Sequence, residues 1–257
     1  MRIALTIAGS DPSGGAGIQA DLKTFMRFGI HGLSAITSIA IQNSSGVKRV
    51  ADLKDHLLEE QLEVLFSDFS VNAVKTGMLY SKENILTVER ALAKNNVAQY
   101  ILDPIIISSS GFPLIVPDGI SLMKERLFPL ATLVTPNLKE AEALSGLSIS
   151  NEEDLQTASE KICSQGPKSV LIKGLVVGRE RIVDLLYSDK GAFRFESEWL
   201  EGRDIDGAGC ILSAAIAASL ASGKEVHDAV EIARSYVLER IRSPLGPGKG
   251  KGFLYLT

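Results

Sequence analysis

The feature that most constrains the fold is a regular alternation of two patterns along the chain. Short apolar runs, each ending at a glycine or a polar cluster, are followed by stretches with the apolar spacing of helices. Strands are predicted over residues 2–8, 33–41, 72–76, 99–102, 131–134 and 169–172, with an antiparallel pair at 182–187 and 192–196. Helices are predicted over residues 18–28, 53–69, 82–95, 118–126, 138–144, 152–165 and 226–242. The alternation predicts an α/β fold with a mostly parallel central sheet and helices on both faces.

Length and charge narrow the function classes. The chain has 257 residues, is 45% hydrophobic and carries a net charge of −4, which suits one domain spanning residues 1–257. Because there is no basic block, nucleic acid is not an expected partner. No run of 18 uncharged apolar residues occurs, and the apolar N-terminal run is short for a signal peptide, so we expect a cytoplasmic protein without a membrane span. Cys163 and Cys210 are expected to be reduced thiols.

Polar and glycine clusters follow the predicted strands. In open α/β sheets, ligands bind at the carboxyl ends of parallel strands. We therefore expect residues that are scattered in the sequence to converge there. They are residues 9–17, Gln42, Asn43, Gly77, Met78, Asp103, Asn137, Lys173 and the turn at 207–210.

The turn formed by Gly207, Ala208, Gly209 and Cys210 precedes an apolar, alanine-rich run at 211–218. Helix N-termini offer unpaired N–H groups and a partial positive charge, and glycines allow an anion to approach the backbone. A thiol at such a position can have its pKa lowered to roughly 3.5–7.5. The turn therefore predicts an anion hole with a general base, Cys210. The alternative is a glycine turn before a buried helix, with Cys210 as a small core residue.

Oxygen-bearing side chains follow two other strands. Asp103 ends one strand, and Asn137 and Glu140 share one face at the start of a helix. Such oxygens suit Mg²⁺ bound with water and substrate phosphates. Taken singly, Asn137 is predicted to be an N-cap and Glu140 a solvated helix acid. Neither a P-loop nor a G-x-G-x-x-G pattern occurs. Together with the strand-end Lys173, these residues favour phosphoryl transfer.

The run Thr6-Ile7-Ala8-Gly9-Ser10-Asp11-Pro12-Ser13-Gly14-Gly15-Ala16-Gly17 resembles the opening signature of the hydroxymethylpyrimidine/phosphomethylpyrimidine kinases, which belong to the ribokinase-like superfamily. The resemblance continues to residue 23 and covers nearly the whole chain in the family's order. It includes Gln42-Asn43, Lys75-Thr76-Gly77-Met78, Asp103-Pro104, Asn137-Leu138-Lys139-Glu140, Lys173-Gly174 and Gly209-Cys210.

This resemblance implies an ATP- and Mg²⁺-dependent kinase of 4-amino-5-hydroxymethyl-2-methylpyrimidine, and of its monophosphate, in thiamine biosynthesis. It implies that Gln42, Asp21 and the Gly9 backbone hold the pyrimidine and that Met78 packs on the ring. Cys210 would take the hydroxymethyl proton, the amides of 207–210 would stabilise the phosphoryl group, and Lys173 would neutralise phosphate charge. Asp103, Asn137 and Glu140 would order Mg²⁺. A homodimer is implied by the resemblance alone.

Three positions depart from the family pattern. Asp206 stands where the family has histidine, Ser109 where it has lysine, and Val176 where it has histidine. These departures support a second reading, a pyrimidine-binding sensor or carrier with weakened catalysis. A third reading is a pyridoxal-type kinase on the same fold, since several such kinases accept both hydroxymethyl heterocycles. The presence of Cys210 with Asn137 and Glu140 favours the pyrimidine kinase over the sensor.

Overall fold

In the computed structural model the predicted strands form one mixed sheet. The structure describes residues 1–53, 56–178, 180–198, 205–242, 246, 248–254 and 256. Within these residues the main sheet has nine strands in the order β3-β2-β1-β4-β5-β6-β7-β8-β9. The strands are β1 (Ile3–Ser10), β2 (His31–Asn43), β3 (Gly46–Asp52), β4 (Ala73–Thr76), β5 (Tyr100–Leu102), β6 (Leu133–Val134), β7 (Ser169–Val177), β8 (Arg181–Ser188) and β9 (Gly191–Glu198). The six strands from β2 to β7 in this order are parallel, and β3, β8 and β9 are antiparallel to their neighbours.

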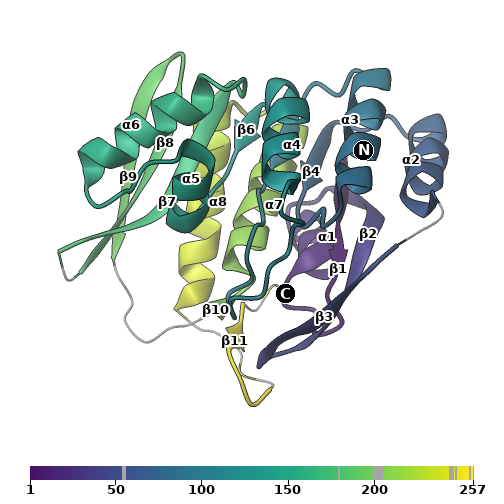
Figure 1. The fold of residues 1–257 in the computed structure, drawn as a ribbon, viewed down its shortest axis with the longest axis horizontal. Coiled ribbons are helices and arrows are strands. Elements are labelled where there is room, and N and C mark those ends of the chain that lie inside the picture. The colour runs from purple at the N-terminus through teal and green to yellow at the C-terminus, as the bar shows by residue number, and fades with distance from the viewer. Residues whose placement is uncertain are drawn as a thin grey trace.

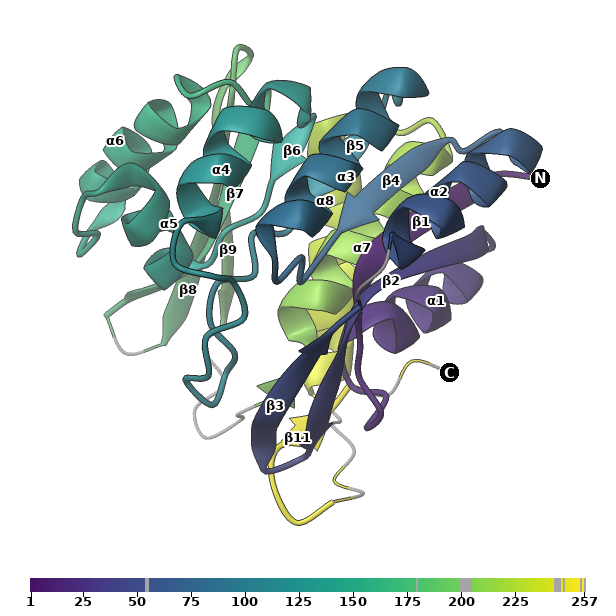
Figure 2. The ribbon, with the colours of Figure 1, turned by 45° about the vertical axis from the view of Figure 1, so that its right-hand side comes forward.

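Helices cover both faces of the sheet, which confirms the predicted fold class (Figures 1 and 2). One face carries α2 (Leu57–Asp68), α3 (Lys82–Lys94), α4 (Gly119–Arg126), η1 (Phe128–Leu130), α5 (Leu138–Ser145) and α6 (Glu152–Cys163). The other face carries α1 (Gly17–Arg27), α7 (Ala208–Ala221) and α8 (Val226–Ile241). No helix in the described part of the chain has the length and apolarity needed to cross a bilayer.

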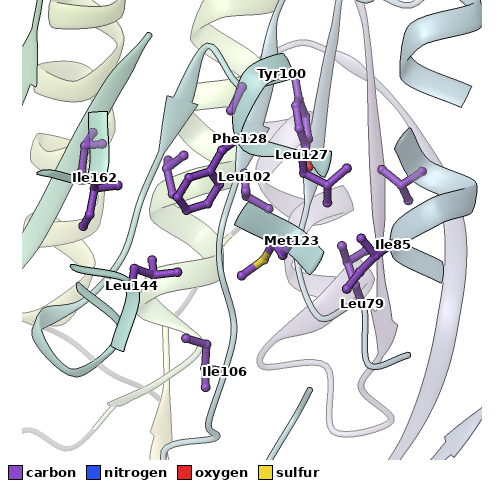
Figure 3. Packing of buried hydrophobic residues seen from close by; sticks show 14 of the residues in the cluster. Leu79, Ile85, Tyr100, Leu102, Ile106, Met123, Leu127, Phe128, Leu144 and Ile162 are labelled. Carbon is purple, nitrogen blue, oxygen red and sulfur yellow. The ribbon is translucent and has the colours of Figure 1, made fainter. Parts of the chain in front are cut away.

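Each face has its own core because the central strands are buried on both sides. On the face of α2 to α6, Tyr100 and Leu102 of β5 pack with Phe128 and Met123, as Figure 3 shows. On the opposite face, β5 contributes Ile101 to the cluster around α7. Because such a strand is buried on both faces, its sequence is expected to be apolar at every position. The two cores fix the sheet, and with it the positions of the strand ends.

Two parts of the sheet differ from the sequence-based prediction. Residues 42–46 were expected to be a turn alone, but β2 runs on to Asn43 and pairs with the unpredicted β3 as a hairpin. Most side chains of β3 are exposed or half-buried, so its sequence lacks the apolar signal of a buried strand. A short parallel pair, β10 (Ile205–Asp206) with β11 (Gly252–Phe253), was also not predicted. It lies beside α7, near the tip of the β2–β3 hairpin (Figure 1).

Candidate active site

The carboxyl ends of the strands surround one cavity of about 1090 Å³. The structure brings together at its wall all but one of the candidate site residues, although residues 12–15 and Asn43 do not line it. Those that line the cavity are Gly9, Gln42, Gly77, Met78, Asp103, Asn137, Glu140, Lys173, Gly207, Ala208, Gly209 and Cys210. The prediction that the strand ends converge in space is therefore confirmed, while the role of each residue stays a prediction.

The helix start predicted from the glycine turn is α7. Gly207 is its N-cap, with a φ of 80°. A Cβ at Gly207 would collide with the carbonyl oxygen of Gly15, so only glycine lets the turn lie against the glycine-rich loop after β1. From Cys210 to its end, every residue of α7 is buried. The first amides of α7 therefore face the cavity from a helix that the core holds in place.

Cys210 differs from its sequence-based prediction. Only 8% of the residue is exposed. This burial raises the pKa of the thiol to about 12, and the Asp103 and Asp21 carboxylates add to the rise. The Lys75 ammonium and a hydrogen bond with the Gly17 backbone act in the opposite direction without overcoming it. The expectation of an easily ionised thiol is wrong for this structure, because the cost of desolvating the thiolate is the largest contribution to its pKa.

Lys173 extends from β7 toward Asp103 at the end of β5. Its Nζ lies 3.2 Å from Asp103 Oδ1. Asp103 also accepts hydrogen bonds from Thr135 Oγ1 at 3.1 Å and from Ser213 Oγ at 3.0 Å. Ser213 belongs to α7, so Asp103 joins three strand ends to the helix that carries Cys210. The Lys173 ammonium lies close to the turn, because a Cβ on Gly209 would be 3.4 Å from its Nζ.

Asn137 and Glu140 form the N-terminal cap of α5. Asn137 Oδ1 accepts the Glu140 N–H at 3.0 Å, and Glu140 Oε2 accepts the Asn137 N–H at 2.9 Å. The N-cap prediction for Asn137 is confirmed. The prediction of a solvated Glu140 is wrong, since only 7% of the residue is exposed. Burial raises the pKa of its carboxyl to about 7; Asp103 adds to the rise, and Lys173 opposes it.

Part of the cavity wall is apolar. Gly9 lies against Met78, and a Cβ on Gly9 would collide with the Met78 Cε. Met78 is held through its carbonyl oxygen, which accepts the Thr37 Oγ1–H at 2.7 Å. Ala40 of β2 and Leu114 pack with Met78 in a small separate core. Gln42, two residues after Ala40, brings an amide to the cavity wall. A flat ring with polar edges fits such a wall.

Asp21 is the predicted site residue that does not line the cavity. It is fully buried on α1. Its carboxylate accepts Thr6 Oγ1–H at 2.6 Å and contacts Lys75 Nζ at 2.8 and 3.0 Å. Direct contact with a pyrimidine ring is therefore not supported. A cavity residue that the sequence analysis did not single out is Lys75, which is held by Asp21. The available signal was a lysine inside an otherwise apolar buried strand, which requires a buried partner.

Asp11 organises the glycine-rich loop after β1, and it too was missed as a separate residue. Its Oδ2 accepts the N–H groups of Gly15 and Ala16 at 3.2 and 2.8 Å, and its Oδ1 accepts the Ser13 N–H at 2.8 Å. An aspartate that binds backbone N–H groups a few residues ahead is the signal of an Asx turn. These bonds fix the loop against which Gly207 lies.

The oxygen ligands fit a Mg²⁺ ion that is bound with phosphates and water. Among the described residues, no three His, Cys, Asp or Glu side chains are placed to hold a metal ion by themselves. Asp103 and Glu140 are both buried, and the Asp103 charge helps to raise the Glu140 pKa. Two such carboxylates favour a cation between them and an incoming anion, and Mg²⁺ usually keeps several waters and takes only one or two carboxylates from the protein.

Comparisons with known proteins identify the family that the chain resembles. A family model described as phosphomethylpyrimidine kinase matches residues 11–254. A bifunctional thiamine biosynthesis protein of Geobacter sulfurreducens is 41% identical over 96% of this chain and 51% of its own length, so the chain spans about half of that relative. A hydroxymethylpyrimidine/phosphomethylpyrimidine kinase of Aquifex aeolicus is 38% identical over 96% of this chain and 97% of its own length.

Solved structures are similar over almost the same extent. A phosphomethylpyrimidine kinase from Clostridium difficile is 41% identical, with a TM-score of 0.83, over 94% of this chain and 100% of that one. A pyridoxal kinase from Staphylococcus aureus, in complex with AMP-PCP and pyridoxal, is 33% identical, with a TM-score of 0.90, over 99% of this chain and 93% of that one. Both a pyrimidine kinase and a pyridoxal kinase therefore share this fold.

Proposed function

Because the chain belongs to the phosphomethylpyrimidine kinase family, we propose that it phosphorylates the hydroxymethyl group of 4-amino-5-hydroxymethyl-2-methylpyrimidine with ATP, and then phosphorylates the resulting monophosphate. The observation that carries the proposal is that one cavity joins an apolar wall with an amide to a helix N-terminus with a lysine. The cavity wall combines Gly9, Met78 and the Gln42 amide with the α7 N-terminus and Lys173. The product is an intermediate of thiamine biosynthesis.

The proposed chemistry uses the protein mainly for positioning and charge neutralisation. The amides of 207–210 hold the phosphoryl group during transfer, and Lys173 neutralises phosphate charge. Cys210 takes the hydroxyl proton when its thiol is ionised. Its high pKa makes this step depend on pH. Lys75, held by Asp21, is the buried cation that favours the thiolate.

Asp103 and Glu140 would hold Mg²⁺ through water, and Asn137 would orient Glu140 through the α5 cap. The ion would supply positive charge to the phosphates of ATP. Hydrogen bonds from Ser213 and Thr135 hold the Asp103 carboxylate at this position.

A coupled ADP-release assay with the hydroxymethylpyrimidine and MgATP tests the proposal. Turnover by the wild type is expected. A fall of at least about 100-fold in Cys210→Ala would support the base assignment, since general bases contribute at least that much. Turnover that survives the substitution would remove Cys210 as the base. An absence of turnover, with pyrimidine binding still seen by calorimetry, would favour the sensor instead.

The sensor reading rested on three departures from the family pattern. Val176 is 43% exposed and is not among the residues that line the cavity, so its change does not touch the site. Ser109 lies in the cavity wall, and its carbonyl oxygen accepts a hydrogen bond from Lys251 Nζ at 3.4 Å, so a lysine from elsewhere in the chain reaches this position. The side chain of Asp206 lies outside the described part of the protein.

Pyridoxal is the second substrate to assay. The observation in its favour is that the pyridoxal kinase of Staphylococcus aureus matches this chain with a TM-score of 0.90. Equal kcat/KM for pyridoxal and the pyrimidine would show a dual enzyme. We further propose that residues 1–257 form one domain and that the protein is a cytoplasmic homodimer. The proposal of a dimer rests on family resemblance, and sedimentation equilibrium tests it.

A further inference from the structure

An ion pair in the cavity wall has no part in the chemistry described above. Asp184 of β8 and Arg234 of α8 both line the cavity, and each residue is only 8% exposed. Arg234 Nε donates to Asp184 Oδ2 at 2.7 Å, and its guanidinium lies 5.0 Å from the centre of the Phe195 ring. Replacing a buried ion pair by apolar residues is often neutral for stability, so stability alone does not account for it.

The pair is attached to the strand that carries Lys173. Asp184 Oδ1 accepts the Gly174 N–H at 2.7 Å. At this point β7 has a bulge. Ile172 pairs with Leu185 and Leu175 with Val183, so that Lys173 and Gly174 both lie opposite Asp184. Bulges redirect side chains, and they occur next to active sites. Gly174 has a φ of 94°, a conformation that favours glycine. We therefore expect the bulge to depend on hydrogen bonds from neighbouring residues.

The bulge is the place where Lys173 leaves the sheet. Its backbone N–H bonds to Pro136 O at 3.1 Å, and its side chain reaches Asp103 on the cavity wall. Only one side of the bulge is thus held by the α5 cap region. Asp184 holds the other side, and Arg234 fixes Asp184 from α8.

We propose that the Asp184–Arg234 pair positions Lys173 by holding the bulge from which this lysine enters the cavity. The inference rests on the proposed kinase function for the role of Lys173 as a phosphate-neutralising group. In this view Asp184 and Arg234 are positioning residues, and their effect on turnover passes through Lys173.

Two uncharged double variants separate the effect of the hydrogen bond between Asp184 and the Gly174 N–H, here called the clamp, from the effect of the buried ion pair. Asp184→Asn with Arg234→Met keeps an oxygen that can accept the Gly174 N–H, whereas Asp184→Leu with Arg234→Met removes it. Neither variant leaves an unpaired buried charge. We expect the leucine variant to lose about 10- to 100-fold in kcat, the range expected for a misplaced catalytic group. The asparagine variant should retain several-fold more activity, and the KM for the pyrimidine should stay unchanged in both.

Coupling to Lys173 is the decisive measurement. In a Lys173→Met background, the leucine substitution should change kcat little, because the group it positions is already absent. An equal fold-loss in both backgrounds would overturn the proposal. Thermal unfolding is recorded for every variant, and Asp184→Ala with Arg234→Met replaces the leucine variant if that one does not fold. Arg194→Gln, which breaks an exposed ion pair with Glu152, is the matched control and should leave kcat unchanged.

Calorimetry with MgADP distinguishes a failure of the proposed kinase function from a failure of the inference that Asp184 and Arg234 position Lys173. If wild type shows no turnover of the pyrimidine, the proposed function fails, and the same cycle is then read from MgADP affinity. The clamp predicts that the leucine variant weakens MgADP binding only when Lys173 is present. Equal weakening in both backgrounds, or a wild type that binds no MgADP, would overturn the inference.

Discussion

At the scale of single residues, the site is set by how buried charges are compensated. Lys75 and Asp21 are both fully buried and form an ion pair with a shortest distance of 2.8 Å. Cys210 lies in the same environment, and burial raises the pKa of its thiol to about 12. A sequence shows the residue types and not the water that folding removes from them. For that reason the position of Cys210 was predictable, whereas the direction of its pKa shift was not.

The raised pKa of Cys210 predicts a pH dependence of turnover. The thiolate is the competent base, and at pH values below about 12 its fraction grows with pH. Where proton transfer limits the rate, kcat should rise about tenfold per pH unit from about pH 6 to pH 9. In Cys210→Ala this rise should be absent. The measurement is single-turnover ADP formation across this range, and a flat wild-type profile would show that Cys210 does not act as the base.

The Lys75–Asp21 pair predicts a large effect on stability when one partner is removed. Lys75→Met leaves the Asp21 carboxylate buried without its cation, which should lower the free energy of unfolding by about 3–5 kcal/mol. Adding Asp21→Asn should recover most of this loss. The control is Lys82→Met, which breaks an exposed pair with Asp118 and should leave the free energy of unfolding nearly unchanged, because solvent screens that pair. Urea unfolding measures all three; a double variant as unstable as Lys75→Met would contradict the argument.

At the scale of elements, the sequence predicted the helices and strands that have a repeated apolar pattern, and it missed features that have none. The strands were predicted because burial on both faces demands continuous apolar runs. The helices were predicted because burial of one face gives apolar residues at helical spacing. The β3 hairpin strand was missed because its side chains are mostly exposed. The β7 bulge was missed because it depends on Asp184 of the next strand and leaves no periodic signal. Of the site, the strand-end residues were predictable, but the buried partners Lys75 and Ser213 depended on tertiary contacts.

The N-terminus of α7 gives a prediction at this scale. Gly207→Ala adds a Cβ that collides with the Gly15 carbonyl oxygen, and the φ of 80° is unfavourable for alanine. The turn must shift, moving the amides of 207–210, and kcat should fall by at least about tenfold, because catalytic geometry tolerates little displacement. Gly146→Ala is the matched control, with a φ of 69° at the end of α5 and no atom near its Cβ.

Both glycine variants should lose about 1–3 kcal/mol of stability, the cost of a strained backbone conformation. Only Gly207→Ala should also lose activity. The measurement pairs thermal unfolding with ADP release, and an equal loss of kcat in both variants would show that strain, and not the position of the α7 amides, limits turnover.

At the scale of the whole molecule, the two cores and the cavity at the strand ends require side chains of opposite polarity. The cores require apolar burial on both faces of the sheet, while the cavity requires charged groups at the same strands' ends. Asp103 and Glu140 place two carboxylates where water is largely excluded. Their repulsion is tolerated because Lys173 and the backbone bonds of the α5 cap stabilise the charges. In the protein without nucleotide or metal, the proximity of these carboxylates therefore lowers the free energy of unfolding. The pH dependence of that free energy should reveal the effect.

This effect predicts how stability changes with pH. Burial raises the pKa of Glu140 from its ordinary 4.5 to about 7, so between these values the folded protein binds more protons than the unfolded chain. The free energy of unfolding should therefore fall as pH rises through this window, with Glu140 contributing about 3 kcal/mol at most. Its contribution is fully present below about pH 4.5 and is lost as pH rises past about 7. Glu140→Gln lacks the titrating group and should show a flatter profile.

The measurement is urea unfolding of wild type and Glu140→Gln between about pH 4 and pH 8 with a chelator present, because linkage predicts the difference in slope and not the absolute stability. Parallel profiles would mean that Glu140 titrates at its ordinary pKa and is not desolvated in solution. Repeating the series with Mg²⁺ and ADP tests the origin of the effect. If a cation binds near Glu140 and Asp103, it favours the charged carboxylate, so the wild-type profile should flatten toward that of the glutamine variant. A wild-type slope unchanged by MgADP would place the metal away from Glu140 and leave Asp103 as the carboxylate to test.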